Sequence, residues 1–113
     1  MANWKALIKK YEGKDIVVVV HLGYNRGLMR KILDQEIELL GKLEFPKIEI
    51  ISGKRYLNFS EKVDSFPMEN ELTGKKFGKV FVCGSQKDRC IPRIEAALKN
   101  HCEKIIRLTS LIH

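Results

Sequence analysis

The spacing of hydrophobic and polar residues alternates between two periods along the chain. Residues 15–21 read DIVVVVH, an uninterrupted β-branched run that is typical of a strand covered on both faces in a parallel sheet. Shorter apolar runs predict further strands over 47–52, 79–83 and 104–108. Apolar residues at intervals of three and four predict helices over 3–12, 28–40 and 89–100, the first with Asn3 as its N-cap.

This alternation predicts an α/β fold. Strands that alternate with helices pack as a parallel sheet, so we expect three layers: a Rossmann-like, mostly parallel sheet of about four strands with helices on both faces. Residues 53–78 are the least regular segment, and its length indicates a short helix within it, which we place over 67–72. A chain of 113 residues without a linker or repeat is expected to form a single domain.

Composition and charge narrow the class of protein. No run of residues approaches the ~18 consecutive apolar positions of a membrane span, so none is expected. Lys plus Arg number 21 against 14 Asp plus Glu, and the formal charge of +7 favours an anionic partner such as a nucleotide, a nucleic acid or an acidic protein. The basic residues are scattered and do not interleave with aromatic residues, which disfavours nucleic acid.

The cysteines bear on the cellular compartment and on metal binding. Cys83, Cys90 and Cys102 form neither a CxxC pair nor the Cys/His spacing of a zinc site, so we predict no metal site and no disulfide scaffold. Lysines interrupt the apolar residues at the N-terminus, which therefore lacks the continuous core of a signal peptide. We expect a cytoplasmic protein.

Three loops that follow predicted strands carry the candidate binding residues. They read HLGYNRG (21–27), SGKRY (52–56) and CGSQKD (83–88), and each combines glycine with hydrogen-bond donors or cations. Ligands of open parallel sheets bind beyond the carboxyl ends of the strands. Because these loops carry donors and cations there, we expect the ligand to present a phosphate or a ribose group. The sequence contains neither GxGxxG nor a Walker motif. The candidate binding residues in these loops are Gly23, Asn25, Arg26, Ser52, Lys54, Arg55, Gly84 and Ser85.

His21 and Cys90 carry reactive groups, and each of them allows two interpretations. His21 follows the apolar strand and is either a general base close to a ligand or a strand-end histidine bonded to backbone. Cys90 is either a nucleophile or a small apolar residue at the start of a helix. Glu36 and Glu38 lie two apart on a predicted helix and so point apart, and we expect both to be solvated charges.

Taken in order, the segments resemble the C-terminal NAD(P)-binding domain of the ferredoxin-NADP reductase family, which includes the cytochrome b5 reductases. Residues 17–40 are similar to the family's strand, Asn/Arg-bearing loop and helix, and 47–52 to its next strand. Residues 61–72 look like the segment after its variable loop, and 79–98 like its strand, Cys-Gly turn and helix. The resemblance covers most of the chain.

The resemblance implies a binding site for NADP or NAD. Cys83, the candidate catalytic residue, would lie near the nicotinamide, and Gly84 would permit its close approach. Asn25 and Arg26 would contact the dinucleotide. Ser52 and Arg55 fall where NADP-preferring members hold the 2′-phosphate, which slightly favours NADP.

The chain also departs from the family. It begins after the family's first strand and Gly-Thr-Gly loop, and it has neither the flavin domain nor a terminal aromatic ring. FAD would therefore enter only through a missing domain or a partner, with an acidic electron-transfer protein as a further candidate partner. The resemblance implies the nucleotide-binding part of a flavoprotein oxidoreductase, inactive on its own. It would be a truncated part of a longer reductase, one subunit of a split enzyme, or a degenerate module that kept the fold and lost the cofactor.

Two alternatives stay open at this point. Gly84, Asp88 and Cys90 have the spacing of the cysteine hydrolases that include isochorismatases, although that chemistry needs an Asp base and a Lys from upstream strands, and Asp15 precedes its strand. A basic, non-enzymatic α/β module that binds nucleic acid or an acidic protein is the other alternative.

Overall fold

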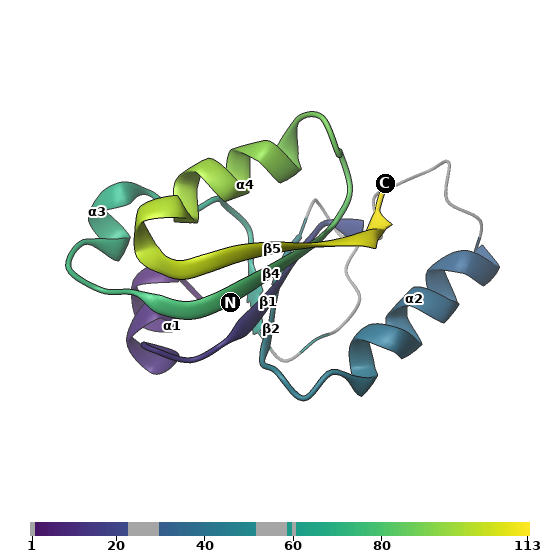
Figure 1. Ribbon diagram of the computed structural model, residues 1–113, viewed down its shortest axis with the longest axis horizontal. Helices are drawn as coiled ribbons and strands as arrows, with labels where there is room; N and C mark the ends of the chain where they lie inside the picture. The colour runs from purple at the N-terminus through teal and green to yellow at the C-terminus, as the bar shows by residue number, and fades with distance from the viewer. Residues whose placement is uncertain (1, 23–29, 52–58, 60) are drawn as a thin grey trace.

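The computed structural model describes residues 2–22, 30–51, 59 and 61–113. Within these residues five strands form one sheet in the order β3-β2-β1-β4-β5, and every neighbouring pair is parallel (Figure 1). The strands are β1 (Ile16–Val20), β2 (Lys47–Ile50), β3 (Glu61–Val63), β4 (Phe77–Gly84) and β5 (Cys102–Ile112). The predicted α/β class is confirmed, and the sheet is wholly parallel.

Helices cover both faces of this sheet, as predicted. They are α1 (Trp4–Lys10), α2 (Arg30–Lys42), α3 (Glu69–Leu72) and α4 (Cys90–Leu98), the last followed by the short 3₁₀ helix η2 (Lys99–His101). Helix α2 lies on the opposite side of the sheet from α1, α3 and α4 (Figure 1). Asn3 caps α1 as predicted, since its side-chain oxygen accepts a hydrogen bond from the backbone N–H of Ala6 at 2.9 Å. No helix among the described residues is long and apolar enough to cross a membrane.

The number of strands is the main correction to the predicted fold. We expected about four strands, and the fifth, β3, lies in the segment predicted to be irregular. Two of its three residues are charged, so it shows no apolar run. It exists because β2 supplies a parallel partner and Val63 is buried in the core. The short helix expected over 67–72 is present as α3.

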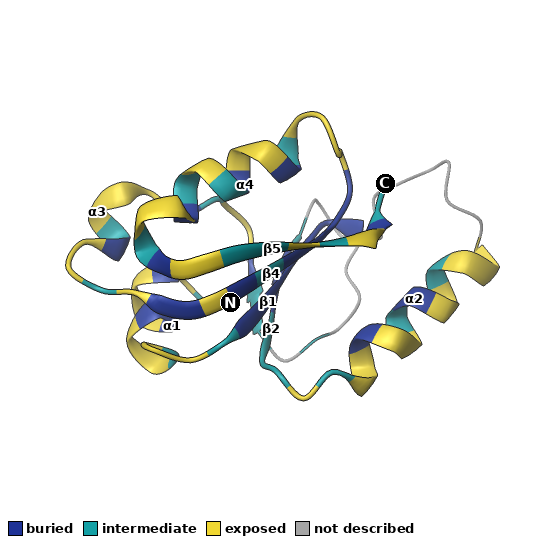
Figure 2. Cartoon of the chain, viewed as in Figure 1, coloured by how far each residue is buried: buried dark blue, intermediate teal, exposed yellow. Residues whose placement is uncertain are grey.

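The two faces of the sheet carry cores of different size (Figure 2). On the face of α1, α3 and α4 the buried cluster extends from Trp4, whose indole N–H donates to the Ser65 carbonyl at 2.8 Å, to Leu98. The cluster on the α2 face is smaller, and Leu40 is the buried apolar residue that α2 contributes to it. Every residue of β1 is buried because both faces of the strand are covered.

Candidate ligand-binding edge of the sheet

All strands end at the same edge of the sheet because they are parallel, and we call this the carboxyl edge. β1 and β4 are neighbours there, since Val20 is paired with Gly84. The chain leaves β1 for α2 on one face and leaves β4 for α4 on the other. Such a divergence of crossovers is where open α/β sheets bind ligands.

The three loops with candidate residues leave the sheet side by side at this edge. β2 is the other neighbour of β1, with Ile50 paired to Val20, so the ends of β2, β1 and β4 are adjacent. Most of the first two loops lies outside the described residues. The candidate residues not described are Gly23, Asn25, Arg26, Ser52, Lys54 and Arg55. Cys83, Gly84 and Ser85 are described, and they form the end of β4 and the residue after it.

Gly84 brings the turn after β4 against the backbone of β1. Its φ is +117°, and a Cβ atom at this position would lie 2.2 Å from the carbonyl oxygen of Val20 and 2.6 Å from its nitrogen. No other residue fits there without opening the sheet. The next N–H, of Ser85, donates to the same Val20 carbonyl at 2.8 Å. Backbone contacts with β1 therefore hold the start of the turn in place.

Ser85 offers an unused hydrogen-bonding group at this edge. The residue is 1% exposed, and its hydroxyl oxygen has no partner within the part of the chain that the structure describes. Buried hydroxyls are rarely left without a partner, so this group is suited to a bound ligand or water.

Cys83 lies beneath the edge and does not reach its surface. The side chain is fully buried, and the thiol donates to the Val18 carbonyl at 3.8 Å. Burial, with a smaller contribution from the negative charge of Glu36, raises the pKa of Cys83 to about 12. It therefore remains a neutral thiol at physiological pH and exposes no surface on which a nicotinamide ring could lie.

The buried Glu36 and the partly exposed His113 form a polar pair that sequence reasoning missed. Glu36 projects from α2 into the protein, and its Oε1 lies 2.5 Å from Nε2 of His113. The expectation that Glu36 is a solvated charge is wrong. A signal was present, because Glu36 lies three residues after Leu33 and four before Leu40 and so shares their face of the helix. Glu38 is exposed, as expected.

His21 continues β1 at the carboxyl edge. Its backbone N–H donates to the Ile50 carbonyl at 2.7 Å, and its φ of 25° is unusual for a residue other than glycine. Burial lowers the pKa of His21 below its usual 6.5, and a hydrogen bond with its own backbone partly opposes the shift. The ring is therefore neutral at pH 7, and this arrangement agrees with the second interpretation, a strand-end histidine bonded to backbone.

A pocket of about 430 Å³ opens at the carboxyl edge beside the first turn of α4. It is lined by Gln86, Lys87, Asp88, Arg89 and His113. Two of these side chains are cations and one is a carboxylate. The Lys87 N–H donates to the His113 carbonyl at 3.4 Å, so the residue after β5 forms part of the wall. The lining suits a ligand with negatively charged groups.

The hydrolase alternative needs an Asp base for Cys90, and Asp15, which precedes its strand, lies at the opposite edge of the sheet from Cys90. Cys90 begins α4 at the carboxyl edge, and its thiol donates to the side-chain oxygen of Gln86 at 3.0 Å. Asp15 lies at the other edge, where its Oδ1 accepts from the Lys79 N–H at 2.8 Å. Asp15 cannot serve as a base for Cys90. Within the described ranges no group of three His, Cys, Asp or Glu residues is placed to hold a metal ion.

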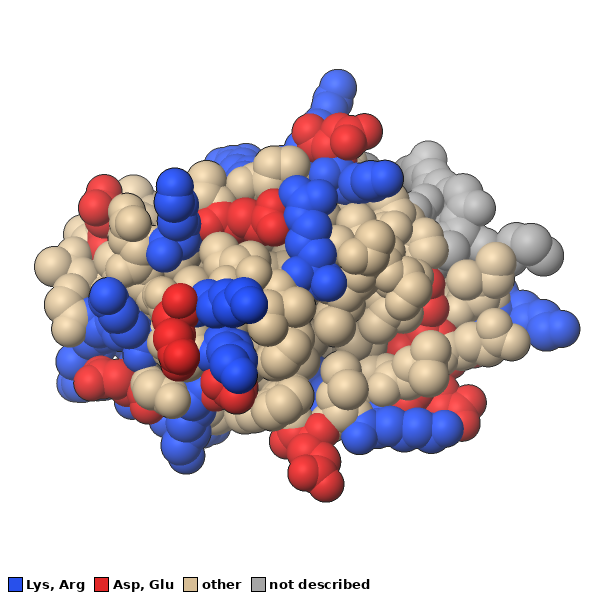
Figure 3. All heavy atoms as spheres, in the orientation of Figure 1, with Lys and Arg blue, Asp and Glu red and all other residues tan. Residues whose placement is uncertain are grey.

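Surface charge gives little support to the nucleic-acid alternative. On the face drawn in Figure 3, Lys and Arg side chains are interspersed with Asp and Glu side chains and gather in no continuous basic patch. Elsewhere among the described residues, basic side chains form ion pairs, such as Arg107 with Glu95 at 2.6 Å. The face drawn in Figure 3 therefore lacks the basic stripe that follows a nucleic-acid backbone.

Comparisons with known proteins found no relative of the chain. No family model matches the sequence, and neither a curated protein nor a solved structure matches it. The resemblance to the ferredoxin-NADP reductase family thus stays a prediction drawn from the order of the segments.

Proposed function

We propose that the carboxyl edge between β1 and β4 binds a pyridine nucleotide, NADP or NAD. The observation that carries the proposal is the strand order, which places β1 and β4 side by side with their crossovers on opposite faces. The chain would act as the nucleotide-binding part of a flavoprotein oxidoreductase, with the flavin held by another domain or by a partner. The nicotinamide would supply a hydride to that flavin when both are bound.

The described residues at this edge match several needs of a dinucleotide. Gly84 fixes the end of β4 against β1, and the Ser85 hydroxyl beside it, which has no partner among the described residues, is available for a hydrogen bond. Lys87 and Arg89 line the adjoining pocket and suit phosphate oxygens. Asn25 and Arg26 are proposed to contact the dinucleotide, and Ser52, Lys54 and Arg55 to hold a 2′-phosphate.

Cys83 enters this proposal in a changed role. The sequence resemblance places it against the nicotinamide, but the side chain is fully buried. We therefore assign Cys83 to packing beneath the end of β4, where it supports the turn at Gly84 and contacts no ligand directly. The three cysteines are free thiols, which accords with the cytoplasm as the proposed compartment.

The binding test is a titration of the chain with NADPH and with NADH, followed by nucleotide fluorescence. We expect saturable binding, weakened about tenfold by Arg26→Gln because a charge-assisted hydrogen bond to phosphate is lost. Arg55→Gln should weaken NADPH and leave NADH unchanged. Lys9→Gln on α1, whose side chain lies far from this edge, serves as the matched charge control. No saturation at millimolar nucleotide would exclude the proposal.

A further inference from the structure

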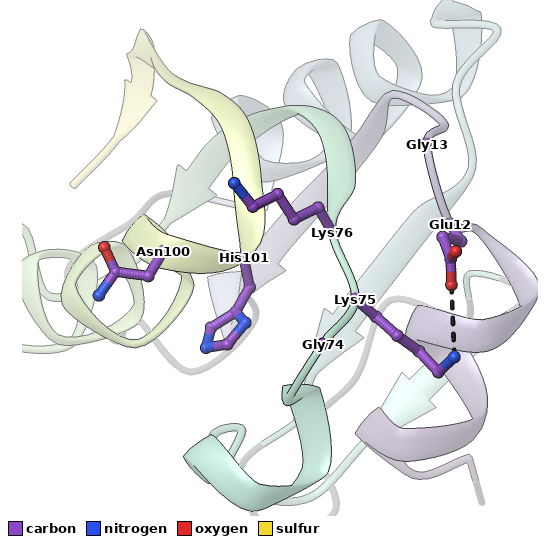
Figure 4. A pocket seen from close by; sticks show the side chains of 7 residues that line it. All are labelled: Glu12, Gly13, Gly74, Lys75, Lys76, Asn100 and His101. Atoms are coloured by element: carbon purple, nitrogen blue, oxygen red, sulfur yellow. Dashed lines mark ion pairs between the residues drawn. The ribbon is translucent and has the colours of Figure 1, made fainter.

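A second hollow lies at the opposite edge of the sheet, where the strands begin, and we call this the amino edge (Figure 4). Its volume is about 470 Å³. Its lining comes from three segments: the turn after α1, the residues just before β4, and η2 just before β5. The side chains that line it are those of Glu12, Lys75, Lys76, Asn100 and His101.

Two glycines with left-handed backbone line this hollow. Gly13 and Gly74 have φ values of +72° and +76°, and a Cβ atom at either position would meet nothing within 4 Å. The walls are joined by backbone, since the Gly13 N–H donates to the Lys76 carbonyl at 2.8 Å. The hollow is thus bounded by ordered main chain and is not filled by the side chains that surround it.

The charges in the hollow are unevenly matched. Lys75 pairs with Glu12 at 3.5 Å, which accounts for the single carboxylate in the lining. Lys76 is exposed, and among the described residues its ammonium has no carboxylate within ion-pair distance. One cation in this lining therefore lacks a counter-ion among the residues that the structure describes.

The side chains also divide in space. Figure 4 shows Lys75 extending toward Glu12, whereas Lys76 extends on the other side of the strand, the side of Asn100 and His101. An ammonium, an amide and an imidazole can each donate a hydrogen bond there, and no carboxylate competes with a ligand for them. This set of donors is suited to an anion that has several acceptor oxygens.

We propose that the amino-edge hollow binds a phosphate group, either carried as a monoester by a small metabolite or present as inorganic phosphate. Lys76, Asn100 and His101 donate hydrogen bonds to its oxygens, and Lys75 adds a second positive charge. The volume lies within the ~300–1,000 Å³ of small-molecule sites. This site is separate from the proposed dinucleotide edge, because β4 runs from one to the other.

The experiment is calorimetric titration of the full chain with inorganic phosphate and with AMP. Lys76→Gln should weaken binding about tenfold, since the unpaired cation is removed. Lys79→Gln is the matched control: Lys79 is an exposed lysine of β4 outside the lining, and its loss should change the affinity by less than about twofold. Glu12→Gln should strengthen binding several-fold because it releases Lys75. Thermal melts verify that all three variants fold.

The outcomes separate the possible sources of the phosphate. Equal affinity for AMP and inorganic phosphate supports a site that reads the phosphate group alone, and binding of inorganic phosphate only restricts the ligand to the free ion. Equal losses in Lys76→Gln and Lys79→Gln would mean unspecific attraction to a basic protein and would overturn the site. No heat of binding at about 10 mM phosphate would do the same. NADPH binding by Lys76→Gln should match that of the unmodified chain, so the two proposals fail independently.

Discussion

The two ends of β4 differ in how they hold polar groups. At the carboxyl edge, the side chains of His21, Glu36 and Ser85 are buried, and Gly84 is pressed against β1. At the amino edge, the polar side chains are largely exposed, and Gly74 faces open space. The polar side chains named here are therefore buried at one end of β4 and largely exposed at the other.

This difference predicts where substitutions and changes of pH affect the stability of the protein. Burial makes each polar group dependent on a fixed partner and each backbone contact intolerant of added atoms. Exposed groups exchange protein contacts for water at little cost. We expect the buried groups and Gly84 at the carboxyl edge to respond strongly to small changes. Gly74 and the exposed side chains of the amino edge should respond weakly, apart from their effect on the affinity for anions.

The largest expected effect comes from two glycines that both have positive φ. Gly84→Ala places a Cβ 2.2 Å from a β1 carbonyl oxygen and should cost about 4 kcal/mol or more, enough to prevent stable folding. Gly74→Ala meets no neighbour and should cost only the ~1–2 kcal/mol of a left-handed backbone. Urea denaturation of both variants measures the difference. Equal losses of unfolding free energy in the two variants would contradict the steric difference between Gly84 and Gly74.

Thiol labelling should rank the three cysteines by exposure and pKa. Cys90 is half-buried and should react first with iodoacetamide at pH 8. Cys102, near the amino edge, should follow slowly because burial raises its pKa. A hydrogen bond with the backbone of Lys104 and, to a smaller extent, the charge of Lys76 partly offset the shift. Cys83, with a pKa of about 12, holds a thiolate fraction of roughly 10⁻⁴ at this pH and should stay unlabelled until the chain unfolds.

Mass spectrometry of a labelling time course gives the order. Labelling of Cys83 before Cys102 in the folded chain would show that the carboxyl edge opens in solution. That result would contradict the burial of the groups at this edge.

The smallest expected effect is in the pH dependence of stability. The folded-state pKa of His21 is depressed below 6.5, so the unfolded chain binds this proton more tightly. The stability that the neutral His21 side chain contributes is fully present above about pH 6.5. This stability is lost as the pH falls from there toward the folded-state pKa. His21→Gln should flatten the melting temperature against pH over this window. An unchanged slope in His21→Gln would contradict the assignment.

Local pattern was enough to predict most of the fold. The apolar run over 15–21 predicts β1, and its unbroken form also predicts that both faces are covered. The amphipathic segment 28–40 predicts α2 to within two residues at each end. Glu61–Val63 escaped prediction because a three-residue edge strand is defined by its neighbour and not by its own composition.

The candidate site was predictable only in part, because its key contacts join distant residues. The loops were located correctly as far as the strand ends that precede them, since parallel strands bring those ends to one edge. The pair of Glu36 and His113 spans 77 positions, and no local spacing reports such a contact. The burial of Cys83 likewise depends on α2 and β1, which precede it by tens of residues.

The central position of β1 has a consequence for how the chain folds during synthesis. Val18 is paired with Val82, so one side of the most apolar strand has no partner until β4 has been made. Contacts of such long sequence separation are slow to form, since a large loop must close first. A nascent chain that ends before Lys79 therefore exposes the unpaired edge of an apolar strand. Surfaces of this kind are prone to aggregation and are bound by chaperones.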